Sequence, residues 1–573
     1  SSQAERVLLY PLSNCEVHGP AARWLCDWLN SPAPAGALGY LRERGLLDEL
    51  QATLEADAWG QALLRLEVQG AEVEPDLLLA ELDGWLQAMR EQDPAQWPQA
   101  ARQALAQTAF DLGPQGDMLD SCRRYAERLL SLPAEQVLDL AGVLLPPLEA
   151  EDWQQLLRQL RPDNRLLLQR LPRLLGGELC AHTQTRWQAR ALPLSAVSTA
   201  NLTGRVGPCL GPLAEAPDGL PWSSVVPGLR LQRFAPAAGA LRTRLAWCWP
   251  DDTASQSERR WLQAAWSLQG EALAQWGERV GVALRWSLAP GQLVLDVSGP
   301  SSLLPAFLRE LLTQLQAPPS PYQLPLIERR SRRWLQQEHD ALPAWRLLQT
   351  LEQERAVSAR RLRDPQALWQ RLCSQAQVIW LKPEGWPEAE QARLANLLIN
   401  LCSQLMQPFA WRCPLPQLQR GQLQVSEVSS KHTDRAQLLY LPAADDSPLE
   451  AACWRQLHHR VADPFFAELR TRQQLGYWVV ARLHRRAGRP GLLLLVQSPD
   501  QSHRRIESAV DDFLAASAQE LSALPADQLQ AQTTHLSQLL EQQRQHPQHS
   551  FEARWEDCVW QRGDQLAAEQ QAL

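Results

Sequence analysis

The sequence predicts an α+β fold of repeated domains, each with a mainly antiparallel sheet packed against helices. Three observations predict this fold. One hairpin pattern occurs three times, a strand and a helical stretch precede each copy, and an amphipathic helix follows each copy. Elements in this order place helices against a sheet, as in layered α+β domains. The chain is therefore interpreted as a set of similar domains rather than as one core.

The three hairpins share a glycine at the start and a turn of hairpin-forming residues. They cover residues 44–70, 280–299 and 475–499. Their first glycines are Gly45, Gly281 and Gly476, and their turns read DAWG, APG and AGRPG. Apolar runs flank each turn, so each segment predicts two paired strands. We expect each glycine to supply the bend that leads into the first strand.

The elements around the hairpins repeat in the same order. Strands are expected at residues 6–12, 243–249 and 436–442, and amphipathic helices at 75–89, 301–315 and 503–517. The first two copies close with a further strand, at residues 164–171 and 377–383. The third copy has no such strand, so its sheet is expected to lack a member or to be incomplete at the C-terminus.

Composition marks the expected domain boundaries. Residues 176–228 are rich in Pro, Gly and Ser and show little periodicity, which is typical of an interdomain linker. We therefore expect one domain at residues 1–175, the linker at 176–228, and further domains at 229–412 and 413–573. A chain of 573 residues is also too long for a single core.

Charge and cysteine content narrow the expected partners and location. The net charge of −8 argues against nucleic acid, which requires a basic surface. No apolar run of about 18 residues or more predicts a membrane span. The eleven cysteines are odd in number and form no CxxC pair. This pattern favours free thiols and a cytoplasmic protein, or a periplasmic one if an upstream signal has been removed.

Motifs for nucleotide, serine-hydrolase and zinc chemistry are absent from this sequence. It contains no GxxxxGK[ST], GxSxG, HExxH or HxxEH. His458 and His459 are adjacent, which points them to different helix faces. His546 and His549 lie beside a proline in a polar context that predicts an exposed loop. We therefore expect this chain to supply no metal ligands.

The segment ELRTRQQLGYWVV, from Glu468 to Val480, ends like a helix and continues like a strand. In a structural interpretation, Arg470 complements the helix dipole and Tyr477 fills a core. In a functional interpretation, both side chains reach one cavity. There a guanidinium and a phenol would hold a peptide carbonyl and stabilise negative charge on its oxygen. Spacing alone favours the structural interpretation.

Residues 465–479, FFAELRTRQQLGYWV, resemble the C-terminal signature of the pitrilysin and insulin-degrading enzyme family. The family pattern is a helix that ends in LRTxxQLGY before a strand, and residues 469–477 match it throughout. Residues 31–52 and 151–171 resemble parts of the family's second domain, and residues 327–354 resemble the long helix of its third. The resemblance thus covers nearly the whole chain.

The resemblance implies the fold and activity of an inverted zincin, which is a zinc-dependent endopeptidase. Its four similar domains form the two halves of a closed chamber. This chain would supply family domains two, three and four. The zinc ligands and general base would lie in the missing N-terminal domain, in its HxxEH helix and a distal glutamate. Arg470 and Tyr477 would bind the peptide substrate and stabilise the tetrahedral intermediate.

The resemblance also implies the partners. They are a short or unfolded peptide and the N-terminal catalytic domain of the same protein, with a homodimer as a further option and neither nucleic acid nor membrane. The compact domains and the Leu-, Gln-, Arg- and Trp-rich composition resemble those of the bacterial members that process the precursor peptide in pyrroloquinoline quinone (PQQ) biosynthesis. Two alternatives stay open: a catalytically inactive peptidase-like subunit that binds peptides or a companion peptidase, and a plain scaffold.

Overall fold

The computed structural model describes most of the chain. The described residues are 5–13, 20–58, 61–70, 75–92, 122, 126, 129, 148–169, 178–179, 186–187, 226–234, 241–250, 253–352, 364–413 and 424–573. The chain divides into two compact units. Unit 1 comprises Ser1–Asp218, Ser267–Ala283 and Gly299–Leu326, and unit 2 comprises Gly219–Trp266, Leu284–Ser298 and Ile327–Leu573.

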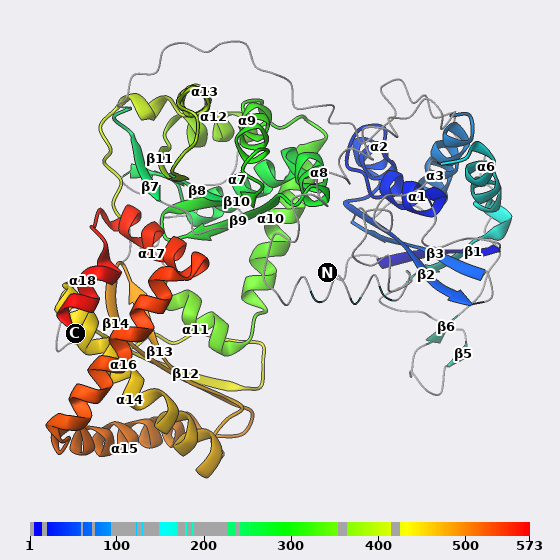
Figure 1. Cartoon of the computed structure of the whole chain (residues 1–573). Coiled ribbons are helices and arrows are strands. Elements are labelled where there is room, and N and C mark those ends of the chain that lie inside the picture. Colours follow the sequence, from blue (N-terminus) through cyan, green and yellow to red (C-terminus); the bar gives the residue numbers. More distant parts are fainter. Residues whose placement is uncertain are drawn as a thin grey trace. The chain divides into compact units, whose positions relative to one another are not determined.

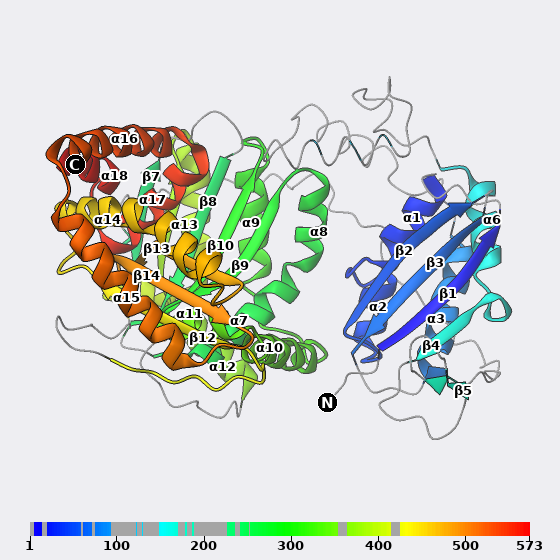
Figure 2. The same cartoon turned by 90° about the horizontal axis from the view of Figure 1, so that it is seen from below.

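Unit 1 contains a four-stranded antiparallel sheet in the order β2-β3-β1-β4, seen face-on in Figure 2. Its strands are β1 (Glu5–Ser13), β2 (Glu49–Ala58), β3 (Gln61–Gln69) and β4 (Leu166–Gln169). Side chains of β3 alternate between buried and half-buried positions, as period-two strands do when one face is covered. The first predicted hairpin is therefore the β2–β3 pair.

Helices cover one face of this sheet. They are α1 (Pro20–Leu29), α2 (Ala37–Glu43), α3 (Pro75–Arg90) and α6 (Ala150–Gln159), and the 3-10 turn η4 (Pro162–Asn164) leads into β4. Trp28, Trp85 and Trp153 are fully buried in the core between the helices and the strands. Unit 1 also holds α8 (Glu271–Arg279) and α9 (Leu304–Gln314), where Trp276 stacks on Phe307.

Unit 2 contains a five-stranded sheet in the order β7-β11-β8-β10-β9. Its strands are β7 (Leu229–Phe234), β8 (Leu241–Cys248), β9 (Ala283–Ala289), β10 (Gln292–Gly299) and β11 (Gln377–Pro383). The β11–β7 pair is parallel, whereas β11 and β8 pair antiparallel. The surrounding helices include α7 (Gln256–Gln269), α10 (Gln323–His339), α12 (Pro365–Ser374), α13 (Glu388–Leu401) and the 3-10 turn η6 (Ser403–Met406).

A second sheet of unit 2 has three antiparallel strands in the order β12-β14-β13. They are β12 (Arg435–Pro442), β13 (Trp478–Arg486) and β14 (Arg489–Ser498). One face packs against α14 (Pro448–Phe466) and α15 (His503–Ser522), and the other against α11 (Pro343–Leu351) (Figure 1). Both faces are thus covered, which explains the uninterrupted apolar run of β14.

Three C-terminal helices complete unit 2: α16 (Ala526–Gln545), α17 (Pro547–Trp560) and α18 (Gln565–Ala572). Phe551 and Trp555 of α17 pack against the five-stranded sheet, in one core with Ile379 and Leu381. Arg244 of β8 forms an ion pair with Glu552 at 2.7 Å. The C-terminal helices therefore join the two sheets of this unit.

The architecture confirms the predicted α+β class, with mainly antiparallel sheets packed against helices. All three predicted hairpins form, and among the described residues the third sheet has no strand equivalent to β4 or β11. The predicted linker, residues 176–228, lies largely outside the described residues. Its described parts include β5 (Glu178–Leu179) and β6 (Arg186–Trp187), a short antiparallel pair.

Candidate functional site: the arginine–tyrosine turn

The helix that carries Arg470 changes geometry before it ends. Ser447 caps α14 by accepting a hydrogen bond from the Glu450 amide, and Pro464 lies inside the helix. After Phe466 the chain continues as the π-helical turn η7 (Ala467–Arg472). A proline within a helix removes one backbone donor, and π-helical turns occur often at functional sites. The sequence signal for this irregularity is Pro464.

Two buried leucines fix the turn from η7 to β13. Leu469 and Leu475 lie in the core between the three-stranded sheet and its helices, and the Leu475 amide donates to the Leu469 carbonyl at 2.9 Å. The bend has its left-handed backbone conformation at Gln474, with a φ of 51°, and Gly476 has no positive φ. This corrects our expectation that Gly476 makes the bend.

Gly476 is required for another reason. A Cβ at this position would overlap the backbone carbonyl oxygen of Gln497 on β14. The chain can therefore approach β14 this closely only with glycine. Gly45 and Gly281, by contrast, do have positive φ angles, of 71° and 76°.

Arg470 lies exposed on η7 and turns back over the bend. Its Nη1 donates to the Gly476 carbonyl at 2.5 Å, and Gly476 directly precedes Tyr477. A guanidinium has five N–H donors, so this bond leaves others for a ligand. The structure thus brings Arg470 to the same turn as Tyr477.

The Tyr477 ring is not sealed in a core, because 44% of the residue is exposed. Its hydroxyl donates to Asp434 Oδ2 at 2.6 Å and accepts a hydrogen bond from Gln497 Nε2. Gln497 Nε2 also donates to Asp434 at 3.0 Å. The structural interpretation of Tyr477 as a core residue is therefore wrong.

These contacts also set the proton affinities at the turn. The hydrogen bond to Asp434 raises the pKa of Tyr477 above its ordinary value. The hydrogen bonds from Tyr477 and Gln497 lower the pKa of the Asp434 carboxyl. The phenol therefore stays protonated, and so stays a possible donor, throughout the neutral range.

Sequence reasoning missed Asp434 and Gln497. Asp434 precedes β12 and lies 43 positions before Tyr477, so only the pairing of β12, β14 and β13 brings the two together. Gln497 gave one signal, because it is the polar residue that directly follows the apolar run LLLLV of β14. A polar side chain in a buried strand requires hydrogen-bond partners.

The described residues do not fit a zinc site. Within them, no three His, Cys, Asp or Glu side chains gather where they could hold a metal ion. His546 and His549 are exposed, as predicted, but they lie at the start of α17 and not in a loop. No described helix is both long and apolar enough to cross a membrane.

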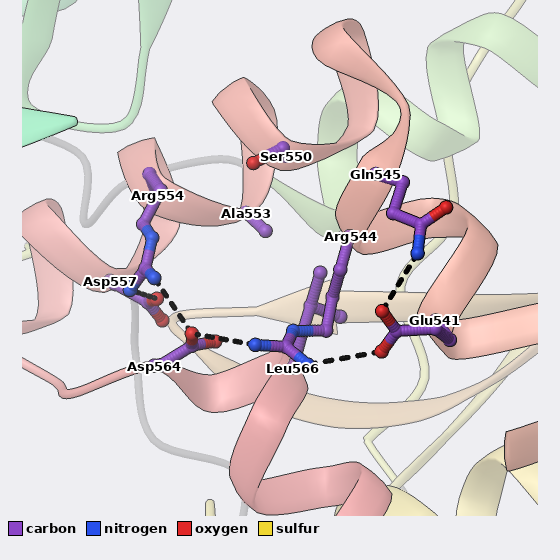
Figure 3. Close-up of a pocket in the computed structure, with 9 residues that line it drawn as sticks. All are labelled: Glu541, Arg544, Gln545, Ser550, Ala553, Arg554, Asp557, Asp564 and Leu566. Carbon is purple, nitrogen blue, oxygen red and sulfur yellow. Dashed lines mark hydrogen bonds and ion pairs between the residues drawn. The ribbon is translucent and has the colours of Figure 1, made fainter. Parts of the chain in front are cut away.

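A pocket of about 220 Å³ lies elsewhere in unit 2, among α16, α17 and α18 (Figure 3). Its charged side chains pair with one another. Arg544 lies 3.1 Å from Glu541 and 3.6 Å from Asp564, and Arg554 lies 2.7 Å from Asp564. Neither Arg470 nor Tyr477 lines it. We therefore regard the pocket as a structural cluster of ion pairs and not as the candidate site.

We expect the stability of the protein to depend on pH through Asp557, a residue that lines this pocket. Asp557 is 2% exposed, and burial raises the pKa of its carboxyl from 3.8 to about 6. Between these pH values the folded chain keeps a proton that the unfolded chain has lost. Stability should therefore fall by about 2 kcal/mol as the pH rises from about 4 to above 6. Asp557→Asn should remove this fall.

Urea denaturation of wild type and Asp557→Asn at about pH 4.5 and about pH 7.5 measures the change in stability. These two pH values lie on either side of about 6, where the buried carboxyl titrates. Asp512→Asn, at an exposed position of α15, is the matched control and should keep the wild-type pH dependence. An equal pH dependence in wild type and Asp557→Asn would contradict the assignment.

Comparison with known proteins shows which folds and families this chain resembles. The family model described as PQQ synthase PqqF-like, C-terminal lobe domain 4, matches residues 456–555, a range that contains Arg470, Tyr477 and Gln497. Pitrilysin has a similar structure, with a TM-score of 0.62 and 16% identity over 100% of this chain and 65% of that chain. The ferredoxin protease FusC, solved with Arabidopsis ferredoxin, gives a TM-score of 0.50 and 11% identity over 100% and 70%. The fold is that of the pitrilysin-type proteins.

Two curated relatives align with most of this chain. Coenzyme PQQ synthesis protein F of Pseudomonas protegens is 26% identical, over 93% of this chain and 61% of that protein. The protein of the same name from Pseudomonas syringae is 25% identical, over 86% and 53%. The chain is therefore similar to proteins named for PQQ synthesis over most of its length, and to the PqqF-like family model over residues 456–555. It spans between about half and three fifths of the length of these two relatives.

Proposed function

We propose that this chain is the C-terminal portion of a zinc-dependent endopeptidase that cleaves short or unfolded peptides in a closed chamber. The proposed substrate is the precursor peptide in PQQ biosynthesis, because the relatives that span most of this chain are named for PQQ synthesis. Residues 1–175, 229–412 and 413–573 would be family domains two, three and four, with residues 176–228 as the interdomain linker. We expect the protein to act in the cytoplasm.

The observation that carries the proposal is the turn that presents Arg470 and Tyr477 together. Both residues are exposed, and Arg470 is hydrogen-bonded to the carbonyl next to Tyr477. A peptide carbonyl at this turn could receive hydrogen bonds from the guanidinium and the phenol. Such donors stabilise the negative charge that develops on the oxygen during hydrolysis more than they stabilise the ground state.

The zinc ion would come from an N-terminal domain outside this chain, where it would supply an activated water. The residues described here would bind and orient the peptide and would stabilise charge on its carbonyl oxygen. A homodimer is compatible with this role but is not required for it.

The test compares the full-length protein with the 573-residue chain alone. We expect the full-length protein to cleave unfolded peptides, to lose cleavage with a zinc chelator and to regain it with zinc, whereas the chain alone cleaves nothing. Zinc-dependent cleavage by the chain alone would overturn the proposal. Binding of peptides by the full-length protein without any cleavage would instead support an inactive peptidase-like partner.

A further inference from the structure

Gln497 is a fully buried polar residue whose side-chain amide is hydrogen-bonded through both its oxygen and its nitrogen. Its Oε1 accepts from the Ala344 amide at the start of α11 at 3.0 Å. Its Nε2 donates to Asp434 Oδ2 at 3.0 Å and to the Tyr477 hydroxyl. Because the Ala344 N–H can only donate, it fixes the oxygen on that side and the nitrogen toward Tyr477.

The backbone of Gln497 holds the same turn a second time. Its carbonyl accepts from the Tyr477 amide at 3.1 Å, and the missing Cβ of Gly476 lets the turn pack against that carbonyl. One residue of β14 thus fixes both the backbone and the hydroxyl of Tyr477. The ring itself remains exposed.

The hydroxyl of Tyr477 has one proton, which it donates to Asp434. To donate to a substrate carbonyl, the hydroxyl must turn that proton away from Asp434. Asp434 would then lose one hydrogen bond but would keep the one from Gln497 Nε2, which is already in place at 3.0 Å. The loss of the phenol's hydrogen bond would therefore leave the carboxylate partnered.

We propose that Gln497 and Asp434 are positioning residues for Tyr477, an inference that rests on the proposed function. Gln497 fixes where the phenol oxygen lies. Asp434 holds the hydroxyl proton until a peptide carbonyl competes for it. Neither residue needs to contact the substrate, so each acts through Tyr477 alone.

Gln377 shows what a purely structural glutamine looks like in this fold. It is also fully buried and begins β11. Its amide bonds only to backbone groups, with the Pro408 carbonyl at 2.7 Å and the Ala410 and Trp411 amides at 2.8 and 3.1 Å. Gln377 is therefore a matched control for the loss of a buried amide.

The test is a double-mutant cycle in the full-length protein with an unfolded peptide as substrate. It uses wild type, Tyr477→Phe, Gln497→Met and the double variant, and it measures kcat, KM and the thermal midpoint. Gln497→Met should lower kcat about 10-fold, or ~1.4 kcal/mol, with little change in KM. The double variant should be no slower than Tyr477→Phe alone, because both changes remove the same positioned hydroxyl.

Gln377→Met should lower the thermal midpoint as Gln497→Met does, and should leave kcat unchanged. If Gln497→Met slows cleavage by the same factor in the wild-type and Tyr477→Phe backgrounds, its effect does not pass through the phenol and the inference fails. It fails equally if Tyr477→Phe slows cleavage and Gln497→Met does not. If Tyr477→Phe itself leaves cleavage unchanged, the proposed role of the site is overturned. The same cycle measures that result separately from the result for Gln497.

Asp434→Ala gives a second cycle if Gln497→Met does not fold. Asp434 lies near the surface before β12, so the substitution changes little packing, although it removes one acceptor from Gln497 Nε2. It should slow kcat about 5-fold in the wild-type background and not at all beside Tyr477→Phe. Equal slowing in both backgrounds, or none in either, would overturn the inference.

Discussion

Replacing Tyr477 by phenylalanine in the full-length protein should lower kcat for peptide cleavage about 100-fold, while the fold stays intact. The substitution removes one oxygen from a residue that is already 44% exposed, so little packing changes. The lost group is the hydrogen-bond donor that we assign to the developing oxyanion. A donor of this kind acts mainly in the transition state, so KM should change less than kcat.

Arg470→Ala should produce a loss of similar size with a larger rise in KM, because a guanidinium also binds the ground state of the peptide. Arg472→Ala is its matched control, since Arg472 lies on the same π-helical turn, is exposed and pairs with Glu468 at 2.9 Å. Tyr440→Phe is the control for Tyr477, since Tyr440 lies on β12 and bonds the Arg489 carbonyl at 3.2 Å. Both controls should keep wild-type turnover.

Peptide turnover that survives both Arg470→Ala and Tyr477→Phe would contradict the proposed site and favour a scaffold role. Equal losses in the site variants and their controls would point to general destabilisation instead. In that case too the assignment of this turn to catalysis would be wrong.

The second large effect concerns stability. Gly476→Ala should lower the free energy of unfolding of unit 2 by about 3 kcal/mol. The added Cβ meets the Gln497 carbonyl, which is backbone in a central strand and cannot move without shifting β14. Because Gln497 also holds Tyr477, turnover should fall with stability.

Gly563→Ala is the matched control, because no atom lies within 4 Å of a Cβ built there. It should be neutral or slightly stabilising, since alanine restricts the unfolded chain. Denaturant midpoints of the two variants measure the difference. Equal midpoints would contradict the prediction, because they would show that a methyl group at position 476 fits beside the Gln497 carbonyl without strain.

Much of the fold could be predicted from local pattern. The hairpins β2–β3, β9–β10 and β13–β14 formed where turn residues separate apolar runs. The absence of a closing strand in the third copy was also read from sequence and agrees with the three-stranded sheet of the described residues. These features depend on neighbours a few residues apart, which a sequence displays directly.

The site could be predicted only in part. Arg470 and Tyr477 are seven positions apart, and the helix-to-strand bend between them is visible in the sequence. The sequence did not show which residue makes the bend. Glycine is the usual residue at a positive φ, yet the positive φ here lies at Gln474. The buried anchors Leu469 and Leu475 decide the path of the chain, and Gly476 is needed for close packing.

By itself the sequence determined the α+β class and the repeated hairpins, and its resemblance to the pitrilysin-type signature pointed to the pair of residues that we propose to bind the peptide carbonyl. Only the tertiary structure decided that Tyr477 is exposed and that Asp434 and Gln497 hold its hydroxyl. The physical reason is the distance along the chain. These partners lie 43 and 20 positions from Tyr477, and strand pairing in the three-stranded sheet brings them within hydrogen-bond reach.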